Sequence, residues 1–126
     1  MKRFSTKLLL VLLVMILMMT ASVTMVSAAQ TSDYSGTTQE QGLQALRSAM
    51  AVVENGTDYV LTLKNNIVIT PDVGTRYDIG TEKTSAATLT VQSELNADGT
   101  PKYGITVGGS AVLNFMGNVT FKNVIL

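Results

Sequence analysis

Apolar and polar positions divide the chain into one unbroken apolar run, one stretch with helical spacing, and many short stretches with strand spacing. The apolar run covers Leu8 to Met19 and contains no charged residue, Gly or Pro. Three basic residues precede it: Lys2, Arg3 and Lys7. Small and polar residues then become frequent between Thr20 and Ala29. This order is typical of a secretory signal peptide, so we expect residues 1–28 to be a signal peptide and the protein to be exported.

Small side chains mark the expected cleavage site. Val26-Ser27-Ala28 fits the site, which would make Ala29 the first residue of the mature chain. The alternative is an uncleaved anchor, because Leu8 to Val26 comes close to the ~20 residues that span a bilayer. Thr and Ser in its second half favour cleavage, after which we expect no contact with the membrane. Residues 29–36 are small and polar, and we interpret them as a flexible leader.

Helical spacing follows the leader. Apolar residues recur at intervals of three or four on one stripe: Leu43, Leu46, Met50 and Val53. Thr37 and Glu40 have the spacing of a capping box, and Asn55-Gly56 supplies a left-handed stop. The pattern predicts a single amphipathic helix over 38–54. Gly42 weakens its first turn by up to ~1 kcal/mol relative to Ala, and the sequence offers no reason for it.

Strand patterns occupy the rest of the chain. Residues 59–63, 67–70 and 87–92 are rich in apolar and β-branched side chains. From residue 104 onward, strands of three to five residues alternate with turns of two or three residues. Residues 71–87 are Gly-rich and charged, and we expect an irregular excursion there. Such a rhythm is compatible with a meander, a sandwich or a solenoid.

Two recurrences favour the solenoid. Ile67 and Ile69 recur as Leu89 and Val91 after twenty-two residues, and a further isoleucine recurs at a shift of twenty, from Ile105 to Ile125. Shifts of this size suit one turn of a parallel β-helix, in which each turn stacks on the previous one. The corners between the strands are too short for crossover helices.

The order of these segments resembles the N-terminal part of a pectin-lyase-like, right-handed parallel β-helix secreted or surface protein. The capped helix LQALRSAMAVVENG, the strands YVLTL and IVIT, and the tail ITVGGSAVLNFMGNVTFKNVIL carry the resemblance, which covers 37–126. It implies that the helix plugs the open end of the β-helix. Enzymes of this family carry their catalytic residues on later turns, and no position here matches such a motif.

The predicted fold class is therefore mainly β: the start of a right-handed parallel β-helix, or solenoid, with an N-terminal amphipathic capping helix. Val124-Ile125-Leu126 is apolar and has no polar cap after it, whereas solenoids need capping repeats. We expect the chain to be truncated at the C-terminus relative to a longer protein. Residues 37–126 then comprise the cap helix and the first turns.

Composition excludes several chemistries. Three of the nine basic residues lie in the predicted signal peptide, so six remain against nine acidic residues, a formal charge of −3. No basic patch stands out, and we expect no nucleic-acid partner. The chain has no Cys and no His, which removes Ser-His-Asp and Cys-His catalysis and ordinary zinc sites.

Two groups of polar residues were weighed as calcium ligands. The segment Asn96-x-Asp98-Gly99-Thr100 resembles the opening of a calcium loop but lacks the closing Glu, so a plain turn is preferred. Asp72, Asp78 and Glu82 lie in the excursion, where a solvated loop is preferred. We assign no catalytic, cofactor-binding or metal-binding residue and expect no cofactor.

These patterns predict an exported extracellular or cell-surface protein that is non-catalytic in this segment and acts in adhesion, structure or association with carbohydrate. Its expected partner is an extracellular polysaccharide or cell-wall component. One alternative is the N-terminal fragment of a polysaccharide lyase or glycoside hydrolase, whose paired carboxylates would lie on further turns. Another is a small carbohydrate-binding β-sandwich.

Overall fold

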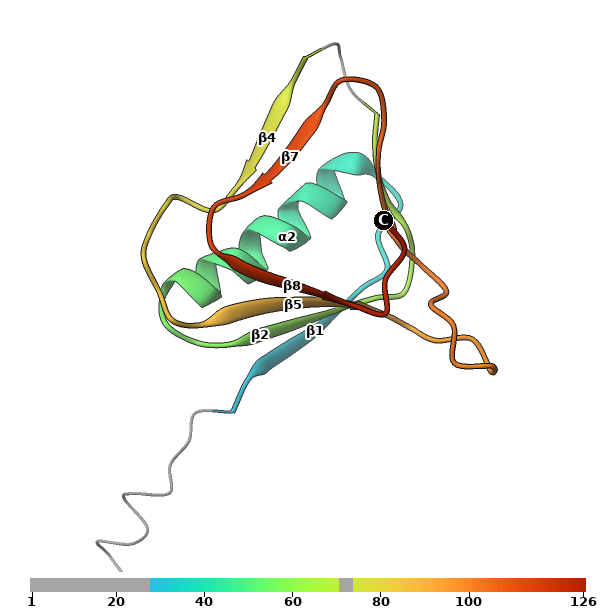
Figure 1. The fold of residues 1–126 in the computed structure, drawn as a ribbon, viewed down its shortest axis with the longest axis horizontal. Coiled ribbons are helices and arrows are strands. Elements are labelled where there is room, and N and C mark those ends of the chain that lie inside the picture. The colour runs from blue at the N-terminus through green and yellow to red at the C-terminus, as the bar shows by residue number, and fades with distance from the viewer. Residues whose placement is uncertain (1–27, 71–73) are drawn as a thin grey trace, which may run out of the picture.

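The structure, a computed structural model, describes residues 28–70 and 74–126 and is mainly β with one helix (Figure 1). The predicted signal peptide lies outside the described residues except for Ala28. The elements follow in the order β1 (Gln30–Tyr34), α2 (Gln39–Glu54), β2 (Tyr59–Leu63), β3 (Ile67–Ile69), β4 (Arg76–Ile79), β5 (Thr88–Ser93), β6 (Ile105–Val107), β7 (Val112–Phe115) and β8 (Asn118–Lys122). Within these described ranges, no helix is long and apolar enough to cross a membrane.

Three small sheets enclose the core. The first sheet has the order β1-β2-β5-β8, the second pairs β3 with β6, and the third pairs β4 with β7. Every pairing in these sheets is parallel. The sheets form three sides of a roughly triangular outline, with α2 lying across its middle (Figure 1). From β2 onward the chain visits the first, second and third sheets in turn, and then repeats that order.

The prediction that residues twenty-two positions apart stack on one another is wrong. Ile67 pairs with Ile105 on the second sheet, whereas Leu89 pairs with Tyr59 and Val119 on the first sheet. Ile67 and Leu89 are both buried, but they belong to different sides of the outline. Side chains on any side can point into the same interior, so a shared apolar pattern does not identify stacked strands. Partners on the first sheet lie thirty residues apart from β2 to β5 and again from β5 to β8.

The second recurrence comes close to the observed pairing. Ile125 forms a parallel bridge with Gly104, and its carbonyl accepts a hydrogen bond from the Ile105 amide at 2.9 Å. The last described residues therefore lie beside β6 and continue the second sheet. The positive φ of Asn123, 47°, lets the chain turn the corner after β8.

The helix is confirmed almost to the residue, but its cap is not the one predicted. Thr38 is the N-cap: its Oγ1 accepts from the Gln41 amide at 3.2 Å, and Gln41 Oε1 accepts from the Thr38 amide at 3.3 Å. The predicted pair of Thr37 and Glu40 is off by one residue. Gln41 is as competent as Glu at this position, and its Oε1 also accepts from the Thr37 amide, so the cap at Thr38 satisfies one more donor.

The predicted helix stripe is the centre of the core. All four of its residues are buried, and the helix packs on β2, β3, β4 and β5. The strands supply fully or almost fully buried partners: Leu61, Leu63, Ile67, Ile69, Ile79, Leu89 and Val91. Gly42 also has a packing reason, because an added Cβ would lie only 2.7 Å from Cγ2 of Ile67. The missing side chain allows α2 to approach β3.

Two segments predicted to be irregular contain strands. The interpretation of residues 29–36 as a flexible leader is wrong, because β1 pairs in parallel with β2 and buries Tyr34 to 5 % exposure. The predicted excursion at 71–87 contains β4, which pairs with β7 and buries Ile79 completely. Both strands lie at a sheet edge, and most of their side chains are exposed or half-buried. Their polar sequences therefore hide backbone pairing that a hydrophobic pattern does not reveal.

Candidate functional site

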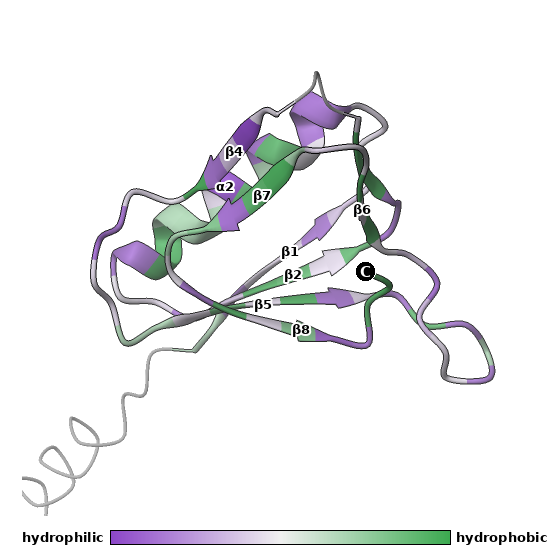
Figure 2. Cartoon of the chain, turned by 45° about the horizontal axis from the view of Figure 1, so that its top comes forward, coloured by the Kyte–Doolittle hydropathy of each residue, from purple (hydrophilic) through white to green (hydrophobic). Residues whose placement is uncertain are grey.

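The outer face of the first sheet is mostly polar, with Val60 as an apolar member. Along β5 the residues facing the core, Leu89, Val91 and Ser93, are buried, while the intervening ones are half-buried. Strand register aligns the outward positions of all four strands in two rows. One row consists of Thr31, Val60, Thr90 and Thr120, and the other of Asp33, Thr62, Gln92 and Lys122. In Figure 2 white and purple positions alternate with green along β5 and β8.

Five of these eight side chains carry a hydroxyl or an amide, and neighbouring strands lie about 4.8 Å apart. Val60 is apolar, and Asp33 and Lys122 are charged. Gln92 Nε2 donates to Thr62 Oγ1 at 3.1 Å, which links two neighbouring strands across the face. A hydroxyl both donates and accepts hydrogen bonds, and an amide does so through two different atoms. The face can therefore bind a flat polar molecule that carries many hydroxyls.

Charged residues continue the face beyond the carboxyl ends of the strands. Lys64 Nζ lies 3.7 Å from Asp33 Oδ2 and 4.0 Å from Glu94 Oε2, and Lys102 Nζ lies 3.9 Å from Glu94 Oε1. The ammonium group of Lys102 also lies 5.5 Å from the centre of the Tyr103 ring. All four charged side chains are substantially exposed, so these pairs are well screened.

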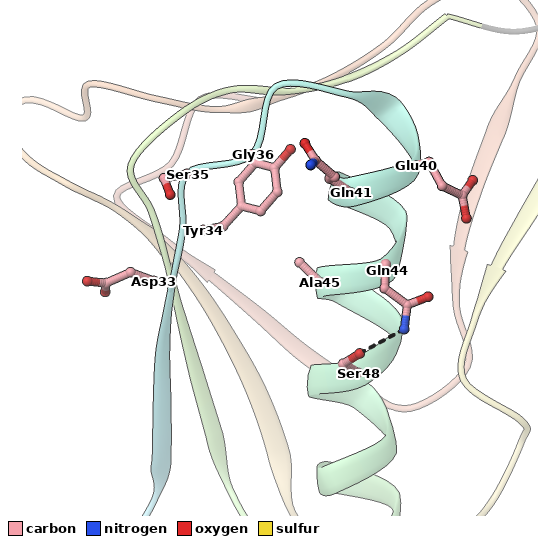
Figure 3. Close-up of a pocket in the computed structure, with 9 residues that line it drawn as sticks. All are labelled: Asp33, Tyr34, Ser35, Gly36, Glu40, Gln41, Gln44, Ala45 and Ser48. Carbon is pink, nitrogen blue, oxygen red and sulfur yellow. Dashed lines mark hydrogen bonds between the residues drawn. The ribbon is translucent and has the colours of Figure 1, made fainter.

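A cleft of about 590 Å³ lies between β1 and the first half of α2 (Figure 3). One wall consists of Asp33, Tyr34, Ser35 and Gly36, and the other of Glu40, Gln41, Gln44, Ala45 and Ser48. The Tyr34 ring points across toward the helix. Its hydroxyl donates to the Thr38 carbonyl at 3.4 Å, and burial raises the pKa of this phenol. Tyr34 therefore closes the junction between strand and helix.

Some polar side chains that line the cleft already make hydrogen bonds within the protein, and others do not. Gln44 Nε2 donates to Ser48 Oγ at 3.1 Å on the helix surface (Figure 3). Gln41 Oε1 is held by the N-terminal cap. Glu40 has an exposed side chain whose carboxylate has no hydrogen-bond or ion-pair partner within the described part of the chain. In Figure 3 this carboxylate points away from Tyr34 and the strand wall, so it lies on the helix surface outside the cleft.

Of the three acids considered as calcium ligands, the structure describes two, Asp78 and Glu82. Asp72 lies outside the described residues. Asp78 belongs to β4, where it accepts from Arg76 Nε at 2.7 Å and from Asn114 Nδ2 at 2.9 Å, and these hydrogen bonds lower the pKa of its carboxyl group. Glu82 has a positive φ of 63° in the following loop. Over 28–70 and 74–126, no cluster of three potential metal ligands is formed.

The second calcium candidate is confirmed as a turn. The Gly99 amide donates to the Asn96 carbonyl at 2.9 Å, and Asp98 Oδ1 accepts from the Thr100 amide at 3.0 Å and from its hydroxyl at 2.6 Å. These bonds lower the pKa of Asp98. The turn forms the tip of a hairpin that projects from the body between β5 and β6 (Figure 1).

A buried carboxylate, Glu54, was missed by the sequence analysis. It ends α2, is 8 % exposed, and accepts from both the amide and the hydroxyl of Thr81, the latter at 2.9 Å. Gly80 makes the close approach possible, because an added Cβ would lie 2.6 Å from Glu54 Oε1. Glu54 therefore fastens the loop after β4 to the end of the helix. The sequence gives no indication that Glu54 is buried, because this residue continues the polar side of the helix.

The sequence analysis also missed the two surfaces that could bind a ligand. Alternating threonines were visible in single strands, but their alignment into rows depends on the thirty-residue register. The cleft depends on β1, which was interpreted as a leader. Comparison of the chain with protein-family models, with curated proteins and with solved structures finds no match.

Proposed function

We propose that the described residues are the capped start of a right-handed parallel β-helix in an exported protein. We further propose that the protein is a non-catalytic scaffold that binds extracellular polysaccharide on the outer face of the first sheet. Support for the β-helix comes from the parallel pairings and the repeated order of the three sheets. Parallel connections within one sheet are right-handed in nearly all proteins.

The observation that carries the function is the pair of aligned polar rows on the first sheet. A polysaccharide presents hydroxyls at regular intervals, and strands about 4.8 Å apart offer donors and acceptors at regular intervals as well. Each neutral hydrogen bond adds only about 0.5–1.5 kcal/mol, so affinity would come from several bonds along one chain. A flat, stiff sheet holds these groups in place before binding, which lowers the entropic cost.

A scaffold is favoured over an enzyme because three of the described carboxylates have structural partners. Asp78 is held by Arg76 and Asn114, Asp98 by Thr100, and Glu54 by Thr81. Glycoside hydrolysis requires two carboxylates facing one bond across about 5–10 Å. The proposal therefore uses the polar rows for binding and assigns no reacting group.

Binding to insoluble cellulose, chitin and peptidoglycan, followed by the fraction of protein retained, tests this function. Replacing Thr90 and Thr120 by Val removes two hydroxyls and keeps the β-branched shape. We expect the double variant to bind its preferred polysaccharide about 5- to 100-fold more weakly, as two lost hydrogen bonds imply.

Thr106→Val is the matched control, because Thr106 is an exposed threonine on β6 of the second sheet. It should bind like the parent protein, and both variants should keep the parent circular dichroism spectrum. Retention on none of the three polysaccharides, or equal weakening by Thr106→Val, would refute the proposed function. Export is tested separately by N-terminal sequencing of the protein recovered outside the cell, which we expect to begin at Ala29.

A further inference from the structure

The turn between α2 and β2 contains the only Asn-Gly pair of the chain, Asn55 and Gly56. Asparagine is a thermolabile residue, and it is most reactive when glycine follows it. Each of the other six asparagines is followed by a residue with a side chain. Asn55 and Gly56 are both exposed, and a Cβ added at Gly56 would have no neighbour within 4 Å. Water and hydroxide therefore reach this pair.

The chemistry open to such a pair is the loss of ammonia from the asparagine side chain. Solvent hydroxide removes the proton of the Gly56 amide, and the nitrogen then attacks Cγ of Asn55. A bond forms between these two atoms, the bond from Cγ to Nδ2 breaks, and the leaving nitrogen takes a proton from water and departs as ammonia. Water opens the resulting succinimide ring to give aspartate or isoaspartate, so the net change is the hydrolysis of one amide.

The end of the helix holds the reacting groups apart. Asn55 is the C-cap of α2, and its ψ of 4° places the Gly56 nitrogen on the side of the Asn55 amide rather than beside the side chain. The Gly56 amide donates to the Val53 carbonyl at 2.9 Å, which shields its proton from hydroxide. The Thr57 amide donates to the Val52 carbonyl at 3.3 Å and fixes the same turn. The reaction therefore requires a local opening of this turn.

A lysine from a distant part of the sequence adds a second restraint. Lys83 Nζ donates to Asn55 Oδ1 at 3.0 Å and so fixes the orientation of the side-chain amide. Lys83 belongs to the loop after β4, and the buried carboxylate of Glu54 fastens this loop through the amide and hydroxyl of Thr81. The loop is thus held against the helix end independently of Asn55, and it keeps the lysine in place.

We propose that Asn55 is a site of spontaneous deamidation, and that the C-terminal cap of α2 and the contact with Lys83 slow the reaction in the folded protein. Conversion to aspartate places a carboxylate beside the ammonium group of Lys83. Conversion to isoaspartate lengthens the backbone between α2 and β2 by one carbon and disrupts the cap. This site is independent of polysaccharide binding, because Asn55 lies outside the polar rows of the first sheet.

Peptide mapping by mass spectrometry tests the proposal on the full chain after incubation in mildly alkaline buffer. We expect the change in mass from amide to acid to appear at Asn55 before it appears at any other asparagine. A synthetic peptide of residues 53–59 lacks the helix and should react about 5- to 100-fold faster than the folded chain, as the loss of the two backbone hydrogen bonds implies. The full chain unfolded in urea should react at the rate of the peptide.

Lys83→Ala should react about 2- to 5-fold faster than the parent protein, because it removes one exposed hydrogen bond. Lys122→Ala changes an exposed lysine on β8, far along the chain from Asn55, and is the matched control that should react at the parent rate. Both variants should keep the parent circular dichroism spectrum. Earlier reaction at another asparagine, equal rates for the peptide and the folded chain, or a Lys83→Ala rate no higher than that of Lys122→Ala would overturn the proposal.

Discussion

The two ends of the body enclosed by the three sheets bury the same kinds of side chain to very different extents. At the end covered by α2, Leu46 and Met50 have no exposed surface and Leu43 retains 2 %. At the other end, Phe121 is 36 % exposed and Ile125 is 52 % exposed, although both lie in or beside parallel strands. Strand stacking covers a side chain from one neighbouring strand at a time. The helix covers several strands at once, so the capped end is where most of the fold's apolar burial is concentrated.

Geometry explains the efficiency of the helix. Its sixteen residues extend over about 24 Å, which is enough to cross the interior between the three sheets and contact strands of each. One apolar stripe meets these strands, while the cleft side remains polar. At the opposite end, contacts such as the edge-to-face pair of Phe115 and Phe121, with ring centres 5.6 Å apart, are made between single side chains.

The largest expected effect comes from truncating one buried side chain at the capped end. Leu46→Ala should lower the free energy of unfolding by about 3–5 kcal/mol, because a fully buried leucine leaves a cavity. Phe121→Ala at the other end should cost about 2 kcal/mol, because a side chain that is already 36 % exposed loses less burial together with its aromatic pair. Urea denaturation followed by circular dichroism measures both. Equal losses would show that the two ends contribute alike.

A smaller effect is expected where the helix meets β3. Gly42→Ala adds a methyl group 2.7 Å from Cγ2 of Ile67 and should destabilise the protein by about 1–3 kcal/mol, despite the better helix propensity of alanine. Gln44→Ala on the exposed side of the same helix is the control, and it should leave the free energy of unfolding within about 0.5 kcal/mol of the parent value. Stabilisation by Gly42→Ala would mean that the helix can move away from β3 without loss.

Gly42 also illustrates where prediction from the sequence ends. The helix and its buried stripe were predictable, because the spacing of Leu43, Leu46, Met50 and Val53 has only one good interpretation. The strands at 59–63 and 67–69 were predictable for the same reason. A glycine required by a neighbour twenty-five residues away was not, since that contact exists only after folding.

Register and polar edge strands were the main failures. Nothing local distinguishes Ile67 stacked on Ile105 from Ile67 stacked on Leu89, because both partners are apolar and strand-forming. The two successive thirty-residue steps of the first sheet are also masked by unequal loops: the hairpin after β5 lengthens the second turn, while the corner between β7 and β8 is short. β1 was missed because it is stabilised by pairing with β2 rather than by its own apolar residues. The cleft was missed with it.

The smallest expected effect concerns the polar contact between β4 and β7, which form the third sheet. Asp78 on β4 accepts a hydrogen bond from Asn114 on β7, while its carbonyl accepts from Arg47 of α2 at 3.2 Å. Its pKa is lowered by hydrogen bonds from Arg76 and Asn114. A folded-state pKa below the unfolded value means that the contribution to stability is present above the ordinary Asp pKa of about 3.9, and is lost as the pH falls through the folded-state value.

Asp78→Asn should therefore lower the melting temperature slightly at neutral pH, where the contribution is present, and leave it close to the parent value in strong acid, so that its decline below about pH 4 is flatter. Melting curves from pH 2 to 7 measure this, with Asp33→Asn as the control, because Asp33 makes only an exposed contact with Lys64. Asp78→Asn could instead leave the decline of melting temperature in acid unchanged. The hydrogen bond between Asp78 and Asn114 would then contribute nothing to the pairing of β4 with β7. The difference between the two ends would then depend on apolar burial alone.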